Sequence, residues 1–322
     1  MRNVTLVGGI LLLAAWSAYG LEVSVALDWT PNTNHTGIFA AEALGYFAEE
    51  GLEVNVLEPS PVVSLQLVAS GRADFGVSSQ EYVTMARAEG TPVVSIATLY
   101  PHNTSGFAAL SSTGILSPAD FAGRRYGGWG SDLEAVMVDT VMTDAGADPS
   151  TVQLVNLGTL DFATAAQAGL ADFFWIYYGW EGIHAQLLGL DVTYLPLANL
   201  DPVLDYYTPV VVASEATLSE KPDVVRRFLR ALARGYAYVA ASPDAASGFL
   251  LAQAPELDRD LVIASQRWLA TQSETSLALW GRQDPEVWRR FAVWALAHAL
   301  IRRAIDSDAA FTNAFLPEAA TP

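Results

Sequence analysis

The sequence predicts an α/β protein of two lobes, each built around an open sheet. Two observations predict this fold class. Short strand patterns alternate with helical patterns along the chain, which is typical of strand-helix-strand units with parallel pairing. The chain of 322 residues is also longer than one hydrophobic core usually supports. A sheet in each of two lobes accounts for both observations.

The elements follow in a regular order. The first strands are expected at 22–28, 52–57, 73–77 and 93–99, with helices at 37–47, 62–69 and 80–89 between them. A second series of strands and helices begins near Phe107 and continues to Leu195, and 208–213 predicts one more strand. Long helices are expected at 222–241, 245–251, 258–268 and 285–305.

The first twenty residues match a secretory signal peptide. Arg2 gives a positive start, Val4–Trp16 an apolar stretch too short to cross a bilayer, and Ala18–Gly20 a small-x-small cleavage site. The alternative is a buried N-terminal strand or helix. The sequence contains no cysteine, so it forms no disulfide and lacks the residue that carries the lipid of a bacterial lipoprotein. We expect a monomeric periplasmic protein without a lipid anchor.

The composition narrows the classes of partner and chemistry. The formal net charge is −18 at pH 7, and Lys221 is the only lysine, so nucleic acid and anionic membranes should repel the chain. The four histidines are scattered without metal-ligand spacing, and neither a G-x-S-x-G turn nor a Walker loop is present. The sequence therefore predicts no metal site and no cofactor.

Clusters of polar and aromatic residues follow several predicted strands, where ligands bind in open α/β sheets. The segment 28–35 offers an indole for stacking, with amides and an imidazole for the edges of a heterocycle. Its candidate residues are Trp29, Asn32, Asn34 and His35. The alternative is a loop in which Asn34 or Thr36 caps the next helix. Residues 78–81 add Ser79 and Glu81, or else form a capping box.

Two further segments lie at expected connections. The segment 102–105 falls at the presumed crossover between lobes and supplies Asn103, Thr104 and Ser105, with a polar hinge as the alternative. The glycine-rich segment 127–130 does not match a dinucleotide-binding spacing, but backbone amides at the start of the following helix could receive a polar ligand edge. Its candidate residues are Trp129, Gly130 and Ser131. Tyr207, directly before the strand expected at 208–213, is a further candidate.

The segment 175–181 is the most informative. Tyr177, Tyr178 and Trp180 flank a glycine, and Glu181 follows directly. Aromatic side chains sandwich a planar ring, and a carboxylate accepts from an exocyclic amine or a protonated ring nitrogen. The alternative is an aromatic core with Glu181 placed favourably at a helix N-terminus.

Four segments resemble the signatures of formylaminopyrimidine-binding proteins: 27–37, 102–107, 126–131 and 175–182. These proteins share a superfamily with the thiamine-pyrimidine synthase, riboflavin-binding proteins and sulfonate-binding SsuA-like proteins. The first signature is common to the superfamily and indicates fold better than ligand. The resemblance implies a type II periplasmic binding protein fold, with two crossovers as a hinge and the ligand in the cleft. Lobe I would comprise 21–106 plus 209–322, and lobe II 107–208.

The resemblance also implies a function. The chain would be the substrate-binding component of an ABC importer, serving a membrane permease with its cytoplasmic ATPase. Its ligand would be a 4-aminopyrimidine thiamine precursor, with riboflavin or another aromatic heterocycle as the alternative. The synthase instead uses pyridoxal phosphate on a lysine, consumes a histidine and has a cysteine-rich iron motif. Here Ser78 and Tyr82 stand where that lysine and histidine are expected, so we expect no enzyme activity.

Overall fold

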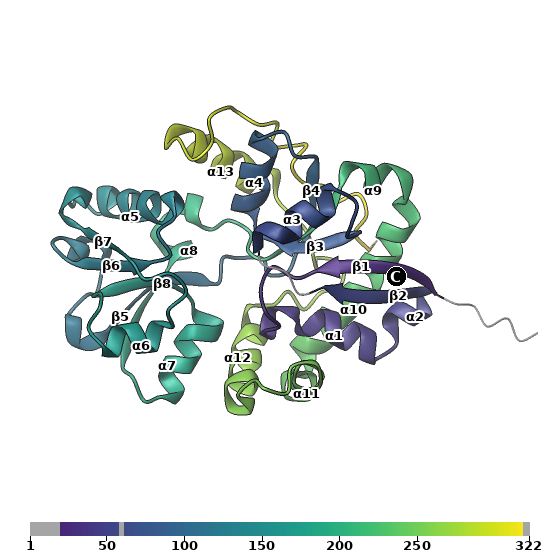
Figure 1. The fold of residues 1–322 in the computed structure, drawn as a ribbon, viewed down its shortest axis with the longest axis horizontal. Coiled ribbons are helices and arrows are strands. Elements are labelled where there is room, and N and C mark those ends of the chain that lie inside the picture. The colour runs from purple at the N-terminus through teal and green to yellow at the C-terminus, as the bar shows by residue number, and fades with distance from the viewer. Residues whose placement is uncertain (1–19, 58–60, 318–322) are drawn as a thin grey trace, which may run out of the picture.

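Two five-stranded sheets organise the chain (Figure 1). The computed structural model describes residues 20–57 and 61–317. The signal peptide predicted at 1–20 lies outside the described residues, apart from Gly20. In the described part of the chain, no helix is long and apolar enough to cross a membrane. The predicted α/β fold with two open sheets is confirmed.

The first sheet has the strand order β2-β1-β3-β10-β4. Its strands are β1 (Leu21–Ala26), β2 (Leu52–Leu57), β3 (Phe75–Ser78), β4 (Val93–Thr98) and β10 (Val210–Ser214). β1 pairs in parallel with β2 and β3, whereas β10 runs antiparallel to β3 and β4. Alternation of side chains gives this sheet two apolar faces: Val25 and Val211 belong to one core, Ala26 and Val212 to the other.

Helices cover both faces of the first sheet. One face packs against α1 (Thr36–Ala43) and α10 (Pro222–Ala241), and the other against α3 (Pro61–Ala69) and α4 (Gln80–Ala88). Phe228 of α10 stacks on Phe75 with ring centroids 3.9 Å apart. The remaining helices of this region are α2 (Tyr46–Glu49), α9 (Glu215–Glu220), α11 (Pro243–Gln253) and α12 (Arg259–Gln272).

The second sheet has the order β7-β6-β8-β5-β9. Its strands are β5 (Ser105–Leu110), β6 (Arg125–Gly128), β7 (Gln153–Asn156), β8 (Phe173–Tyr177) and β9 (Val192–Pro196). α5 (Asp132–Asp144) and α8 (Leu197–Leu200) pack on one face, and α6 (Phe162–Gln167) and α7 (Ile183–Leu187) on the other. A π-helical turn, η5 (Tyr178–Gly182), joins β8 to α7.

Two crossovers connect the sheets. The first runs from β4 to β5 and the second from η6 (Pro202–Leu204) to β10. Asn103 ties them together, since its Nδ2 donates to the Leu204 carbonyl at 2.8 Å and its backbone N–H donates to Asp205 at 2.9 Å. The two-crossover arrangement is therefore confirmed. The lobe boundaries stay a prediction, and β5 already begins at Ser105, ahead of the predicted boundary at 107.

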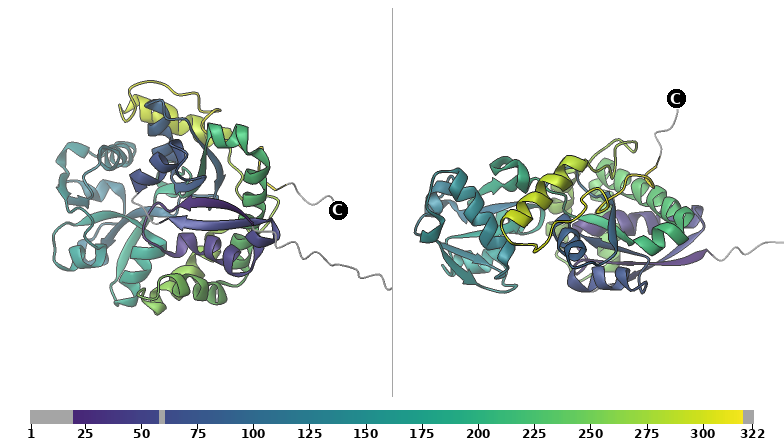
Figure 2. Two further views of the ribbon diagram at one scale, coloured as in Figure 1. Left: turned by 45° about the vertical axis from the view of Figure 1, so that its right-hand side comes forward. Right: turned by 90° about the horizontal axis from the view of Figure 1, so that it is seen from above.

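Helix α13 (Pro285–Ala297) packs against both sheets. Its Trp288 lies in a core of the first sheet, whereas Phe291 and Trp294 lie in the core between the second sheet and α5. The Trp294 indole N–H donates to Thr140 Oγ1 of α5 at 3.2 Å. Figure 2 shows α13, near the yellow end of the chain, crossing from one lobe to the other. Side chains of α13 thus pack against both sheets.

Two predicted helices differ from the structure. The helix expected at 37–47 is divided into α1 and α2 at Gly45, whose φ of 77° favours glycine. The helix expected at 285–305 ends at Ala297. There the backbone turns, with Ala299 at φ 59° and the Leu300 N–H donating to the Ala295 carbonyl at 2.9 Å, which ends the helical pattern.

Candidate functional site

A cavity of about 770 Å³ lies between the two sheets. Segments that follow β1, β3, β6, β7 and β8 form its wall, as expected for a ligand site at the carboxyl ends of strands. Many of the predicted site residues line it. They are Trp29, Asn32, Asn34, Ser79, Glu81, Thr104, Trp129, Ser131, Tyr177, Trp180 and Glu181. The structure does not bring His35, Asn103, Ser105, Gly130, Tyr178 or Tyr207 to this wall.

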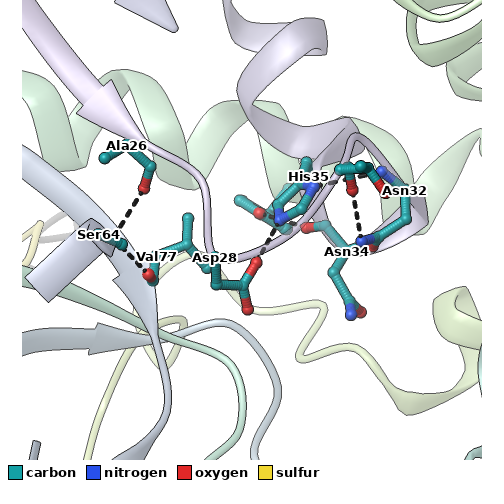
Figure 3. A network of polar contacts seen from close by, with 9 residues as sticks. Ala26, Asp28, Asn32, Asn34, His35, Ser64 and Val77 are labelled. Atoms are coloured by element: carbon teal, nitrogen blue, oxygen red, sulfur yellow. Dashed lines mark hydrogen bonds and ion pairs between the residues drawn. The ribbon is translucent and has the colours of Figure 1, made fainter. Parts of the chain in front are cut away.

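His35 holds the loop after β1 in place. Its ring is fully buried, and Nδ1 accepts from the Asn32 backbone N–H at 3.2 Å. Nε2 therefore carries the proton and donates to Asp28 Oδ1 at 2.7 Å, a contact drawn in Figure 3. Asn32 Oδ1 in turn accepts from the Asn34 N–H at 2.9 Å. His35 thus orients the loop, while Trp29, 47% exposed, stays at the cavity.

The segment after β3 brings a buried acid to the cavity. Glu81 is only 2% exposed, and its Oε2 has no hydrogen-bond partner within the described residues. Burial raises the pKa of Glu81 to about 7, and the negative charge of Asp28 adds to the effect. Ser79 is the N-cap residue of α4, but its side chain makes no capping hydrogen bond. The capping-box alternative is therefore not formed, and Glu81 is available to the cavity.

The end of β8 supplies a second acid with aromatic neighbours. The Tyr177 backbone N–H donates to Glu181 Oε2 at 3.0 Å, which fixes the carboxylate beside Tyr177 and Trp180 in the wall. Burial raises the pKa of Glu181 to about 7. Tyr178 turns away instead: its ring lies 4.3 Å from that of Tyr194 and 5.2 Å from that of Trp268. Tyr178 therefore packs among aromatic side chains, as the alternative interpretation of this segment predicted.

Trp129 and Trp175 form an aromatic corner on the second sheet. Their rings meet edge to face with centroids 5.0 Å apart, and Trp129 remains 40% exposed. The amides at the start of α5 are already used, because Trp129 N–H and Ser131 N–H donate to the Glu134 carboxylate at 2.9 and 2.8 Å. Gly130 serves the turn, with φ 83°. Glu134 therefore occupies the backbone amides that we expected to receive a ligand.

The remaining predicted residues support the hinge. Asn103 Oδ1 accepts from the N–H and the hydroxyl of Ser105 at 2.9 and 2.6 Å, so both belong to the polar hinge that was the alternative reading. Tyr207 accepts from the Asp284 backbone N–H at 2.8 Å through its hydroxyl. Only Thr104 of the segment 102–105 reaches the cavity.

The lining is acidic. The lining residues include no arginine, lysine or histidine. Their charged side chains are the carboxylates of Asp28, Glu81, Asp132, Asp161 and Glu181. Within the described residues, no group of three histidine or acidic side chains is placed to hold a metal ion. The cavity can therefore hold a neutral or positively charged ligand but offers a phosphate no cation.

Several lining residues were not predicted. Asp161 caps α6, with Oδ1 accepting from the Thr164 N–H at 2.9 Å, and an acid at a helix start after a strand was the available signal. Trp175 is part of the predicted segment 175–181, but it lies on strand β8 itself and was not among the predicted contacts. Leu257, Leu269 and Leu300 come from the C-terminal region, in which the sequence predicted helices and no ligand contact.

A cleft between two α/β sheets joined by two crossovers defines a ligand-binding protein with the periplasmic binding protein fold. The family model described as "NMT1/THI5 like" matches residues 32–246, and the chain belongs to this family. The fold agrees with the periplasmic aliphatic sulphonate binding protein SsuA of Escherichia coli. That structure superposes with a TM-score of 0.73 at 16% identity, over 90% of this chain and 97% of that one.

Curated relatives span nearly the whole chain. The formylaminopyrimidine-binding protein of Halalkalibacterium halodurans is 31% identical, over 90% of this chain and 89% of that protein. A 4-amino-5-hydroxymethyl-2-methylpyrimidine phosphate synthase of Legionella pneumophila is 29% identical, over 94% and 95%. The riboflavin-binding protein RibY of Chloroflexus aurantiacus is 27% identical, over 92% and 86%.

Proposed function

We propose that this protein is the periplasmic substrate-binding component of an ABC importer and binds a 4-aminopyrimidine thiamine precursor. Formylaminopyrimidine and hydroxymethylpyrimidine are the two candidates. The observation that carries the proposal is Glu181, held by the Tyr177 N–H in a cavity wall that also contains Trp180. The similarity to a formylaminopyrimidine-binding protein supports it.

The chemistry of this corner suits an aminopyrimidine. The Tyr177 and Trp180 side chains offer apolar surface to a planar ring. Because its pKa lies near 7, Glu181 accepts from an exocyclic amine when ionised and donates to a ring nitrogen when protonated. Asn34, in the loop after β1, supplies an amide donor and acceptor for the other edge of the ring, whereas the Asn32 amide is engaged within that loop.

The residues favour binding over synthesis. The synthase chemistry requires a lysine that can form a Schiff base with pyridoxal phosphate inside the cleft. Lys221 is the only lysine of the chain, and its Nζ pairs with Asp74 Oδ1 at 2.8 Å, outside the cavity lining. Ser78 and Tyr82 stand in the wall at the positions where the synthase lysine and histidine are expected. These residues do not fit that cofactor.

Transport implies partners and a location. A membrane permease and its cytoplasmic ATPase would receive the ligand from a monomeric, unanchored binding protein. The signal sequence expected at 1–20 and the absence of cysteine support this part of the proposal. Riboflavin is the second candidate ligand, since a cavity of about 770 Å³ can enclose a larger ring system and one relative is a riboflavin-binding protein.

Titration calorimetry with formylaminopyrimidine, hydroxymethylpyrimidine and riboflavin tests the ligand. We expect the pyrimidines to bind and Glu181→Gln to weaken that binding by about 1–3 kcal/mol, because the variant cannot satisfy the same donors. Glu220→Gln is the matched control, since it removes one exposed acid outside the cavity. Binding of riboflavin alone would overturn the pyrimidine assignment, and unchanged affinity in Glu181→Gln would remove Glu181 from the site.

A further inference from the structure

Four polar atoms in the cavity wall have no hydrogen-bond partner within the described residues. They are Ser78 Oγ, Ser79 Oγ, Glu81 Oε2 and Trp175 Nε1, and every one of these residues is at least nine-tenths buried. A buried polar atom without a partner costs about 1–3 kcal/mol, so proteins rarely keep several of them together without use. Three of them, on Ser78, Ser79 and Glu81, lie together at the end of β3 and the start of α4, which indicates a ligand group that satisfies them there.

The two buried acids come from different sheets. Glu81 belongs to α4, which covers the first sheet, whereas Glu181 belongs to η5 at the end of β8 in the second sheet. The cavity of about 770 Å³ is also in the range that encloses drug-sized molecules, which exceeds the needs of a single pyrimidine ring.

The surroundings of Glu81 favour a positive charge. Asp28 lies close enough to raise the pKa of Glu81, and Tyr82 is near Glu81, Asp28 and Glu134 of the facing lobe. The exposed indole of Trp129 and the edge-packed Trp175 face the same cavity. Aromatic faces beside a carboxylate bind cationic groups through cation–π attraction and charge pairing.

We propose that Ser78, Ser79 and Glu81, together with Trp129 and Trp175, form a second subsite that binds a cationic group attached to the ring held at Glu181. This inference rests on the proposed function, because it assumes an aminopyrimidine at Glu181. It assigns the ligand to a class: an aminopyrimidine that carries a second, positively charged part. A phosphate in the same place would meet the Glu81 and Asp28 carboxylates, with no cation among the lining residues to offset them.

Two probes separate the subsites. Hydroxymethylpyrimidine occupies the Glu181 corner only, whereas thiamine links the same aminopyrimidine to a positively charged thiazolium ring. In calorimetry at pH 8 we expect thiamine to bind on the order of tenfold more tightly than hydroxymethylpyrimidine. Glu81→Gln should abolish this preference and leave the affinity for hydroxymethylpyrimidine within about twofold. Glu181→Gln should weaken both.

Matched variants guard against effects on folding. Glu89→Gln removes an exposed acid at the end of the same helix and should change neither affinity. Trp129→Leu alters a half-exposed side chain and should weaken thiamine binding selectively. If hydroxymethylpyrimidine binds and thiamine binds no more tightly, or if Glu81→Gln weakens both equally, the second subsite is overturned and the proposed function stands. If neither pyrimidine binds, the proposed function itself fails.

Discussion

Replacing Glu81 by glutamine should make the empty protein more stable at alkaline pH. Burial places the pKa of this carboxyl at about 7 in the folded protein, against an ordinary value of 4.5 in the unfolded chain. Between these pH values the folded protein holds a proton that the unfolded chain has released. Folding stability contributed by Glu81 is therefore complete below pH 4.5 and is lost as the pH rises towards 7.

The size of the effect follows from the two pKa values. The interval between 4.5 and about 7 corresponds to roughly 3 kcal/mol in the free energy of unfolding. Glutamine has nearly the same shape and carries no charge, so Glu81→Gln escapes this loss. Glu181 titrates in the same range in both proteins, and the difference between them isolates Glu81.

Urea unfolding followed by tryptophan fluorescence measures this difference. The variant should match the parent protein near pH 4.5 and exceed its free energy of unfolding by up to about 3 kcal/mol at pH 8. Glu89→Gln, which removes an exposed acid on the same helix, should show no such divergence. A constant difference between variant and parent across this pH range would refute the reasoning, because Glu81 would then have the same pKa in the folded protein and in the unfolded chain.

Two further predictions concern the hinge and the lobes. Asn103→Ala removes the bonds to the Leu204 carbonyl and to Ser105, and should lower the free energy of unfolding by about 1–3 kcal/mol in urea titrations. Unchanged stability would show that the crossovers do not depend on this side chain. Saturating hydroxymethylpyrimidine should close the lobes and reduce the radius of gyration in X-ray scattering. An identical radius with and without ligand would contradict hinge closure.

The elements of the sheets could be predicted because their patterns are local. Alternating residues such as Val23 and Val25 indicate a strand. The aromatic and acidic composition of the segment ending at Glu181 indicates a binding site. The direction of a side chain is a different matter. His35 and Tyr178 have the composition of ligand contacts, yet one supports Asp28 and the other packs against Trp268. Sequence spacing does not distinguish the wall of a cavity from its support.

One local pairing was overlooked in the sequence. Ser131 and Glu134 have the spacing of a capping box, and in the structure the Glu134 carboxylate occupies the amides before α5 that were expected to meet a ligand. Similarly, Leu269 is buried on α12 among apolar residues such as Leu261, and nothing local shows that it also faces a cleft. The pKa of Glu81 is raised by burial and by the charge of Asp28, which is far from it in the chain, so the shift could not be derived from its sequence neighbours.

The placement of α13 has a consequence for the order of folding. Trp288 fills a core of the first sheet, and Phe291 and Trp294 fill the core of the second. Both cores thus use side chains that are made after every strand in the described part of the chain. Each lobe completes its packing only when α13 has been synthesised and has docked. The last step in the folding of one lobe is therefore coupled to that of the other.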